Sequence, residues 1–144
     1  MSTSTRSRDR RIIDNLFKLA QDVEGISSAR LACCIVIKNN IIAYGFNQKK
    51  SHPFQAQYGK NEDSIYLHAE TDAIKNALRR VNQEDLTKAT LYIVRAKYDE
   101  NGHWAHGLSK PCSGCARAIA AFGIKNVVYT TEVYNSGGNY YKYL

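Results

Sequence analysis

The chain has 144 residues, of which 44% are hydrophobic, and it carries a formal net charge of +7. This length suits one domain that buries a core of its own without disulfide staples. The sequence contains no apolar run of 18 residues and its basic N-terminus has no apolar stretch, so it predicts neither a membrane span nor a secretory signal.

The first half of the chain predicts a helix followed by a β-hairpin. Its expected elements are a disordered basic leader (1–9), a helix (10–23), two strands joined by a turn at residues 39–40 (31–38 and 41–46) and a long polar connection (47–67). Apolar residues at helical spacing indicate the helix, and Gly25 ends it. The apolar, partly β-branched runs on either side of two asparagines are typical of a hairpin.

The second half of the chain alternates helices and strands. Its expected elements are a helix (68–80), a strand (90–96), a second long loop (97–110), a helix (112–122), a strand (126–130) and a C-terminal tail (135–144). A strand, a helix and a strand at this spacing predict a right-handed parallel crossover. We therefore expect an α/β protein whose single domain spans residues 10–134.

Two short motifs carry chemistry. His68-Ala69-Glu70 is followed by Pro111-Cys112-Ser113-Gly114-Cys115. A catalytic zinc ion takes three protein ligands and leaves a fourth position open, and His68, Cys112 and Cys115 supply that number. The spacing of the two cysteines places both thiolates within one turn at a helix N-terminus, where the helix dipole favours deprotonated sulfur. A cytoplasmic location, which the absence of a signal favours, would keep these thiols reduced.

The third residue of the first motif adds an acid/base group. Glu70 lies two residues past His68 and is predicted to take a proton from the attacking water and to pass it to the substrate without ligating the metal. The alternative is a closed structural zinc site, whose fourth ligand would be one of five other residues. These are His52, His103, His106, Cys33 and Cys34. Such a site has no use for Glu70, and we interpret Cys33 and Cys34 as core residues on opposite faces of a strand.

These motifs, together with Gly45-Phe46-Asn47, resemble the cytidine and deoxycytidylate deaminase superfamily, whose signature they match. Within it the chain is most similar to the deoxycytidylate deaminases, from about Ser28 to Tyr134. The resemblance implies a three-layer α/β/α sandwich with a mixed central sheet, one catalytic zinc ion and a homo-oligomer.

The resemblance also implies substrate contacts, residue by residue. Asn47 matches an asparagine that hydrogen-bonds the nucleotide, and the N–H of Ala69 and the carbonyl of Lys110 match groups that hold the pyrimidine. Arg30 stands where the family has basic residues before the first strand, and Tyr134 where it has an aromatic one. The chain departs from the family in residues 48–53 and in the longer loop before Pro111, which holds His103, Trp104 and His106.

The function that follows is hydrolytic deamination of a cytosine nucleotide, dCMP above all, to the uracil nucleotide and ammonia. One alternative is a deaminase of cytosine or adenine in a DNA or RNA strand, which would use the positive charge and Trp104 for docking. A basic tail on an ordinary surface explains the same charge. A lesser alternative is an inactive zinc-folded binding module.

Overall fold

The computed structural model describes residues 3–23, 30–47, 68–98, 101–132 and 141–144. The elements in chain order are α1 (Thr3–Gln21), β1 (Arg30–Ile37), β2 (Asn40–Phe46), α3 (Ala69–Ala77), the 3₁₀ helix η2 (Gln83–Lys88), β3 (Thr90–Tyr98), β4 (Trp104–Gly107), α4 (Ser113–Ala121), β5 (Asn126–Thr130) and β6 (Tyr141–Tyr143). None of the helices in these ranges is long and apolar enough to cross a membrane.

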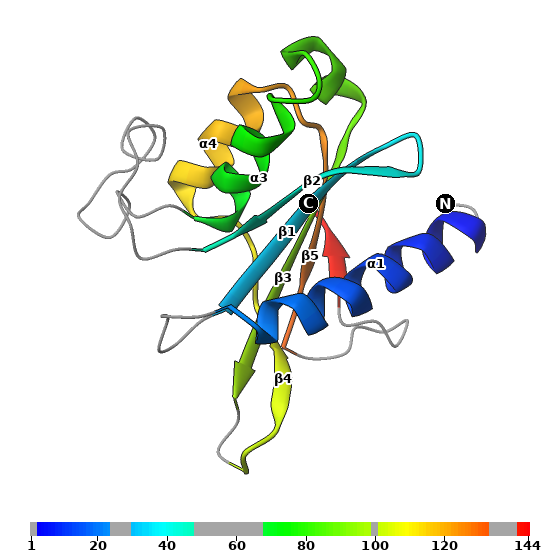
Figure 1. Cartoon of the computed structure of the whole chain (residues 1–144). Helices are drawn as coiled ribbons and strands as arrows, with labels where there is room; N and C mark the ends of the chain where they lie inside the picture. The colour runs from blue at the N-terminus through cyan, green and yellow to red at the C-terminus, as the bar shows by residue number, and fades with distance from the viewer. Residues whose placement is uncertain (1–2, 24–29, 48–67, 99–100, 133–140) are drawn as a thin grey trace.

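The strands form one mixed six-stranded sheet in the order β2-β1-β3-β5-β6, with β4 paired to β3. β3 and β5 are parallel, as the predicted crossover requires, and the other pairs are antiparallel. Figure 1 shows α1 on one face of this sheet and α3 and α4 on the other. The predicted three-layer α/β/α sandwich is therefore confirmed.

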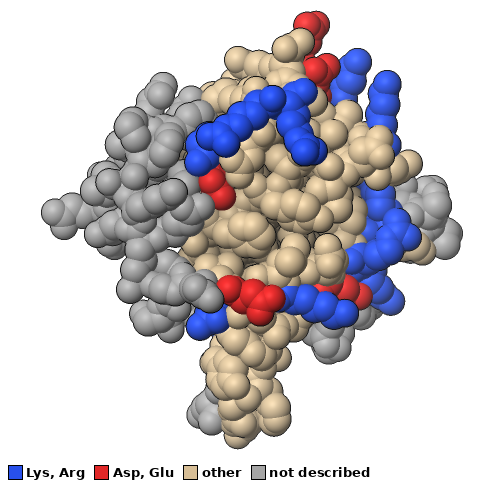
Figure 2. Space-filling view, viewed as in Figure 1, with Lys and Arg blue, Asp and Glu red and all other residues tan. Residues whose placement is uncertain are grey.

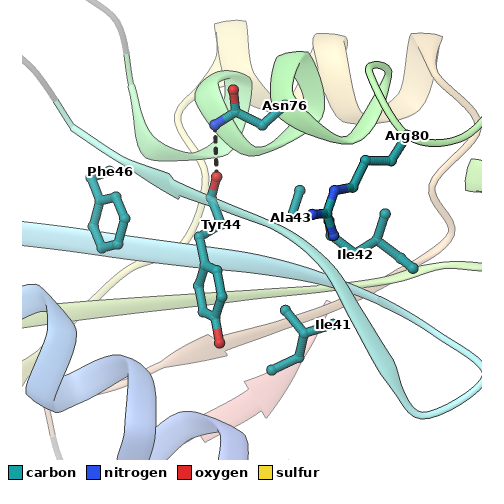
Figure 3. Close-up of a pocket in the computed structure, with 7 residues that line it drawn as sticks. All are labelled: Ile41, Ile42, Ala43, Tyr44, Phe46, Asn76 and Arg80. Carbon is teal, nitrogen blue, oxygen red and sulfur yellow. Dashed lines mark hydrogen bonds between the residues drawn. The ribbon is translucent and has the colours of Figure 1, made fainter.

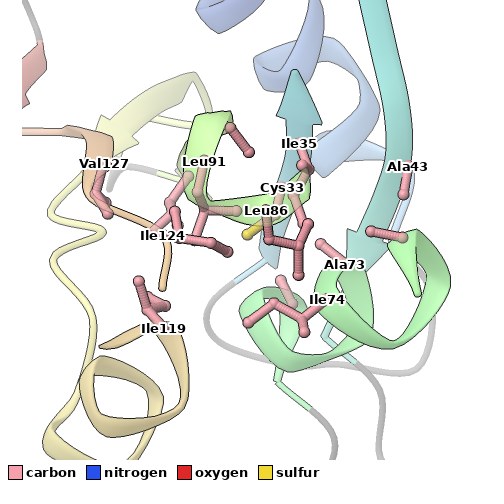
Figure 4. Close-up of a cluster of buried hydrophobic side chains, with 14 of the residues drawn as sticks. Cys33, Ile35, Ala43, Ala73, Ile74, Leu86, Leu91, Ile119, Ile124 and Val127 are labelled. Carbon is pink, nitrogen blue, oxygen red and sulfur yellow. The ribbon is translucent and has the colours of Figure 1, made fainter. Parts of the chain in front are cut away.

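Each face of the sheet has its own hydrophobic core, because side chains alternate along a strand. Odd-numbered residues of β1, β3 and β5, such as Cys33, Leu91 and Val127, pack against α3 and α4 (Figure 4). Even-numbered residues, such as Cys34 and Tyr92, pack against α1. The prediction that Cys33 and Cys34 are core residues on opposite faces is confirmed.

Helix α3 is joined to the outer edge of β2 by a row of side chains spaced four residues apart. Asp72 Oδ2 accepts a hydrogen bond from the backbone N–H of Phe46 at 3.0 Å. Asn76 Nδ2 donates to the carbonyl of Tyr44 at 2.8 Å, and Arg80 Nη1 donates to that of Ile42 at 3.4 Å. At this edge Asn76, Arg80 and residues of β2 line a pocket of about 430 Å³, shown in Figure 3.

Glycine is required where α3 meets β2. A Cβ atom at Gly45 would lie 2.2 Å from the carbonyl oxygen of Ala69 and 2.3 Å from the backbone nitrogen of Ala73. The helix therefore rests directly on the backbone of the strand. This contact positions the first turn of α3, which contains Glu70.

Two predictions for the ends of the chain differ from the structure. Residues 3–9 were predicted to be disordered, but α1 begins at Thr3. The buried carboxylate of Asp9 accepts hydrogen bonds from the hydroxyls of Tyr92 and Tyr143, the latter at 2.7 Å, and so holds this part of the helix against the sheet. The end of the predicted tail joins the sheet as β6, which pairs with β5.

Two predicted connections also differ. The hairpin turn is formed by Lys38 and Asn39, with φ angles of 51° and 67°, because Ile37 pairs with Asn40 and leaves a two-residue loop of the kind that needs positive φ. The segment 97–110 was predicted to be a loop, but β3 extends to Tyr98 and β4 folds back on it. Strand β4 and the end of β3 project beyond the rest of the sheet (Figure 1).

Candidate metal centre

The three predicted ligands meet where the N-termini of α3 and α4 face each other. His68 is the N-cap residue of α3, and Cys112 is the N-cap residue of α4. The Sγ atom of Cys112 accepts a hydrogen bond from the backbone N–H of Cys115 at 3.5 Å, so the spacing of the two cysteines is fixed by the first turn of the helix. Long-range packing of α3 against the sheet brings His68 to the same place.

The donor atoms have the spacing that a tetrahedral zinc ion requires. Nδ1 of His68 lies 3.2 Å from Sγ of Cys115 and 3.8 Å from Sγ of Cys112, and the three ligand atoms are all within 4.8 Å of one another. Two ligands on one tetrahedral zinc ion are about 3.5 to 3.8 Å apart, given Zn–N and Zn–S bonds of about 2.1 and 2.3 Å. One imidazole and two sulfurs therefore fit a zinc ion here.

The thiol of Cys112 is readily deprotonated. Hydrogen bonds from Cys115 and His68 lower the pKa of Cys112 to about 3. The hydrogen bond to Cys112, together with burial, raises the pKa of Cys115. Since zinc binds thiolates, a proton on Cys115 must leave when a cation binds both sulfurs.

Glu70 lies in the first turn of α3, and only 4% of its surface is exposed. Burial raises the pKa of its carboxyl group, while its own backbone N–H and the nearby His68 act in the opposite direction. The thiol of Cys33 lies in the same electrostatic environment: burial and then Glu70 raise its pKa. The core below the centre therefore holds Glu70 in a water-poor setting, where an acid/base group is most effective.

Some of the predicted substrate contacts lie next to the metal donors in the structure, and others do not. Ala69 is buried at the start of α3, beside His68, and Lys110 directly precedes Pro111. Asn47 follows β2, and its Oδ1 accepts a hydrogen bond from the N–H of Leu31 at 2.8 Å. Tyr134, like His52, lies outside the described residues.

Arg30 is not brought to the face of the sheet that carries the metal donors. As an even-numbered residue of β1 it faces α1, where Nη1 donates to the carbonyl of Gln21 at 2.7 Å. Its guanidinium also lies 5.2 Å from the ring centroid of Trp104. On the same face, His106 stacks on Phe17 with 4.3 Å between the ring centroids, so the long segment before Pro111 packs against α1.

Sequence reasoning missed the residues that hold α3, the helix capped by His68, in place. Asp72 accepts a hydrogen bond from the N–H of Phe46, 26 positions earlier in the sequence, and Gly45 lies against the backbone of Ala69 and Ala73. The signal that could have found Asp72 is the series of polar residues four positions apart, Asp72, Asn76 and Arg80. Ser109 was also missed: its hydroxyl is buried and bonds both the backbone N–H of Thr130 at 2.7 Å and the carbonyl of Ile93 at 2.8 Å.

Comparisons with known proteins agree with this geometry. A family model described as the cytidine and deoxycytidylate deaminase zinc-binding region matches residues 6–131. The deoxycytidylate deaminase of Mycobacterium phage D29 is 38% identical over 68 residues, which are 47% of this chain and 39% of the phage protein. The chain thus matches well under half the length of that relative.

Two solved structures share the fold. The apo dCMP deaminase of cyanophage S-TIM5 superposes with a TM-score of 0.50 at 18% identity, covering 88% of this chain and 82% of the other. The same enzyme in complex with dCMP and dUMP gives a TM-score of 0.51 at 19% identity, with 88% and 81% covered. From the length of the family match and the zinc-compatible donor set, the chain belongs to the cytidine and deoxycytidylate deaminase zinc-binding family.

Proposed function

We propose that this protein is a zinc-dependent hydrolytic deaminase that converts dCMP to dUMP and ammonia. The observation that carries the proposal is the placement of Glu70, which is buried in the first helical turn after His68, next to three donors with zinc spacing. A structural zinc site needs no such carboxylate. The names of the phage relative and of the cyanophage structures support dCMP as the substrate.

The residues have separate roles in this reaction. Nδ1 of His68 and the sulfurs of Cys112 and Cys115 would hold zinc, which supplies the Lewis acidity that makes water nucleophilic near neutral pH. The carboxylate of Glu70 takes a proton from the attacking water and delivers it to N3 of the cytosine ring. It then transfers the second proton to the departing amine, so that water and cytosine give uracil and ammonia. The N–H of Ala69 and the carbonyl of Lys110 orient the base.

A free nucleotide is favoured over a nucleic-acid strand by the distribution of charge. On the face shown in Figure 2, the described basic side chains lie in several separate groups, with acidic side chains among them. A strand-binding groove would instead align basic and aromatic side chains along one path. We also propose that the protein is cytoplasmic and forms a homo-oligomer. Light scattering of the purified protein tests the oligomeric state.

The test is ammonia release from dCMP, deoxycytidine, dCTP and single-stranded DNA by the zinc-loaded protein. Turnover should be fastest with dCMP. Glu70→Gln keeps the shape of the side chain but cannot accept the proton, so it should lower kcat by about 100-fold or more with zinc retained. Cys115→Ser should lose zinc as well as activity. Wild-type turnover by Glu70→Gln would contradict the proposal.

A further inference from the structure

Arg95 lies on the same face of the sheet as the metal centre. The odd-numbered residues of β3, Leu91 and Ile93, pack under α3 and α4, and Arg95 is the next residue of this series. Ile93 pairs with Cys33, whose thiol lies near Glu70 and Cys115. Arg95 is therefore about 6.6 Å further along the strand from the row beneath the metal centre, at the carboxyl end of the parallel pair.

The strand register also aligns Arg95 with Asn47. Leu31 pairs with Arg95 on one side, and on the other side it exchanges hydrogen bonds with Asn47, which directly follows the pair of Ala32 and Phe46. Neighbouring strands are about 4.8 Å apart, so the backbones of Asn47 and Arg95 are separated by about 10 Å. A nucleoside monophosphate is of comparable length.

Gly107 leaves room for the side chain of Arg95, and Thr130 holds its backbone. A Cβ atom at Gly107, the residue paired with Arg95 on β4, would lie 2.8 Å from Arg95 Cδ and 2.9 Å from Cγ. The arginine stem thus lies flat on the glycine. The N–H of Arg95 donates to Oγ1 of Thr130 at 3.2 Å, and that hydroxyl donates to the carbonyl of Gly107 at 2.7 Å.

The guanidinium has a buried donor that the described residues do not satisfy. Nε of Arg95 is inaccessible to solvent and has no hydrogen-bond acceptor among the described residues. The nearby carboxylate of Glu132 pairs with Lys97 Nζ at 2.9 Å. A buried N–H without a partner is costly, so the side chain is poorly satisfied as it stands. Since Arg95 as a whole is only partly buried while Nε is closed to solvent, a ligand would meet the terminal Nη groups of the guanidinium.

We propose that Arg95 binds the 5′-phosphate of the substrate and thereby selects a nucleotide over a nucleoside. The inference rests on the proposed deaminase function and deepens it. A guanidinium offers two parallel N–H groups that match two phosphate oxygens, and this geometry is stronger and more specific than a single charge. Gly107, on which the arginine stem rests, leads directly to Cys112, so the support of the phosphate contact and a metal ligand lie on one stretch of chain.

The test compares dCMP and deoxycytidine as substrates of Arg95→Gln, Arg95→Lys and wild type. In Arg95→Gln the KM for dCMP should rise about 10- to 100-fold, whereas kcat/KM for deoxycytidine should stay within about twofold. Arg95→Lys keeps the charge and the stem over Gly107 but loses the fork, so its KM for dCMP should be intermediate. Arg11→Gln removes the same charge from an exposed position on α1, across the sheet, and should match wild type.

Calorimetry with dUMP and deoxyuridine tests the phosphate contact independently of the deaminase activity. Loss of dUMP binding in Arg95→Gln, with deoxyuridine binding unchanged, supports the phosphate contact. If the wild-type protein releases no ammonia, that result refutes the deaminase proposal alone and leaves the phosphate contact standing. Equal losses for dCMP and deoxycytidine, or a wild-type KM for dCMP in both Arg95 variants, would overturn the inference. Zinc content and melting temperature of each variant show that the site is intact.

Discussion

Gly45 is the position where a single methyl group should disturb the metal centre without touching a ligand. Its Cβ would lie 2.2 Å from the Ala69 carbonyl oxygen, whereas ordinary contact begins at 3.4 Å, so α3 must recede by about 1.2 Å in Gly45→Ala. The atoms in the way belong to helix backbone and cannot rotate aside. We expect a loss of about 3 kcal/mol in the free energy of unfolding, at the upper end of the usual range for overpacking.

The displacement should also weaken zinc binding. His68 moves with α3 while both cysteines stay on α4, so the present donor distances of 3.2 and 3.8 Å would no longer be kept. We expect zinc affinity to fall about 10-fold or more, as when groups that orient metal ligands are removed. Urea unfolding of the metal-free protein and competition with a chelator measure the two effects separately.

Two further variants test the reasoning behind this prediction. Gly102→Ala introduces a side chain at a φ of 81° in the turn between β3 and β4, so it should cost stability but leave zinc affinity unchanged. Ala73→Gly removes a methyl group from α3 but none of the backbone atoms that block Gly45→Ala. Restoration of zinc affinity in the double variant would therefore refute the backbone-contact argument.

Asp9→Ala should lower the free energy of unfolding by about 3 kcal/mol in urea titrations, because the buried hydroxyl of Tyr92 loses its acceptor and Tyr143 loses a charge-assisted hydrogen bond. A change below about 0.5 kcal/mol would show that α1 does not depend on this contact. Burial lowers the pKa of His106, so the folded protein binds fewer protons than the unfolded chain; stability should be complete above pH of about 6.5 and fall as the pH decreases below it. Replacing His106 by Phe keeps the stacking on Phe17 and should flatten this acid limb of a melting-temperature profile; an unchanged profile would assign the dependence to other groups.

The metal centre could be predicted because most of its geometry is local. The turn that begins at Cys112 brings Cys115 to it whatever the rest of the fold does, and the spacing of His68 and Glu70 needs only one helical turn. The parallel order of β3 and β5 also follows from chain order alone. The first two features depend on near neighbours in the sequence, and the third on the handedness of the crossover connection. The meeting of His68 with the two cysteines depends on long-range packing.

The features that sequence reasoning missed depend on distant partners. The start of α1 is set by Asp9, whose partners Tyr92 and Tyr143 lie far along the chain. Strand β4 has little apolar alternation of its own and forms because β3 offers a free edge beyond the end of β5. The orientation of Arg30 follows from its even number on β1, but only once it is known that α1 covers that face.

The row of Asp72, Asn76 and Arg80 also has a consequence for how copies of this protein can associate. An uncovered edge strand is a template on which another chain can add a strand by pairing with free N–H and C=O groups. On β2 the N–H of Phe46 and the carbonyls of Tyr44 and Ile42 already bond to side chains of α3 and of Arg80, which follows it. A strand that added to this edge would have to displace these three bonds and would disturb the strand on which α3 rests. We therefore expect copies of this protein to associate through other surfaces.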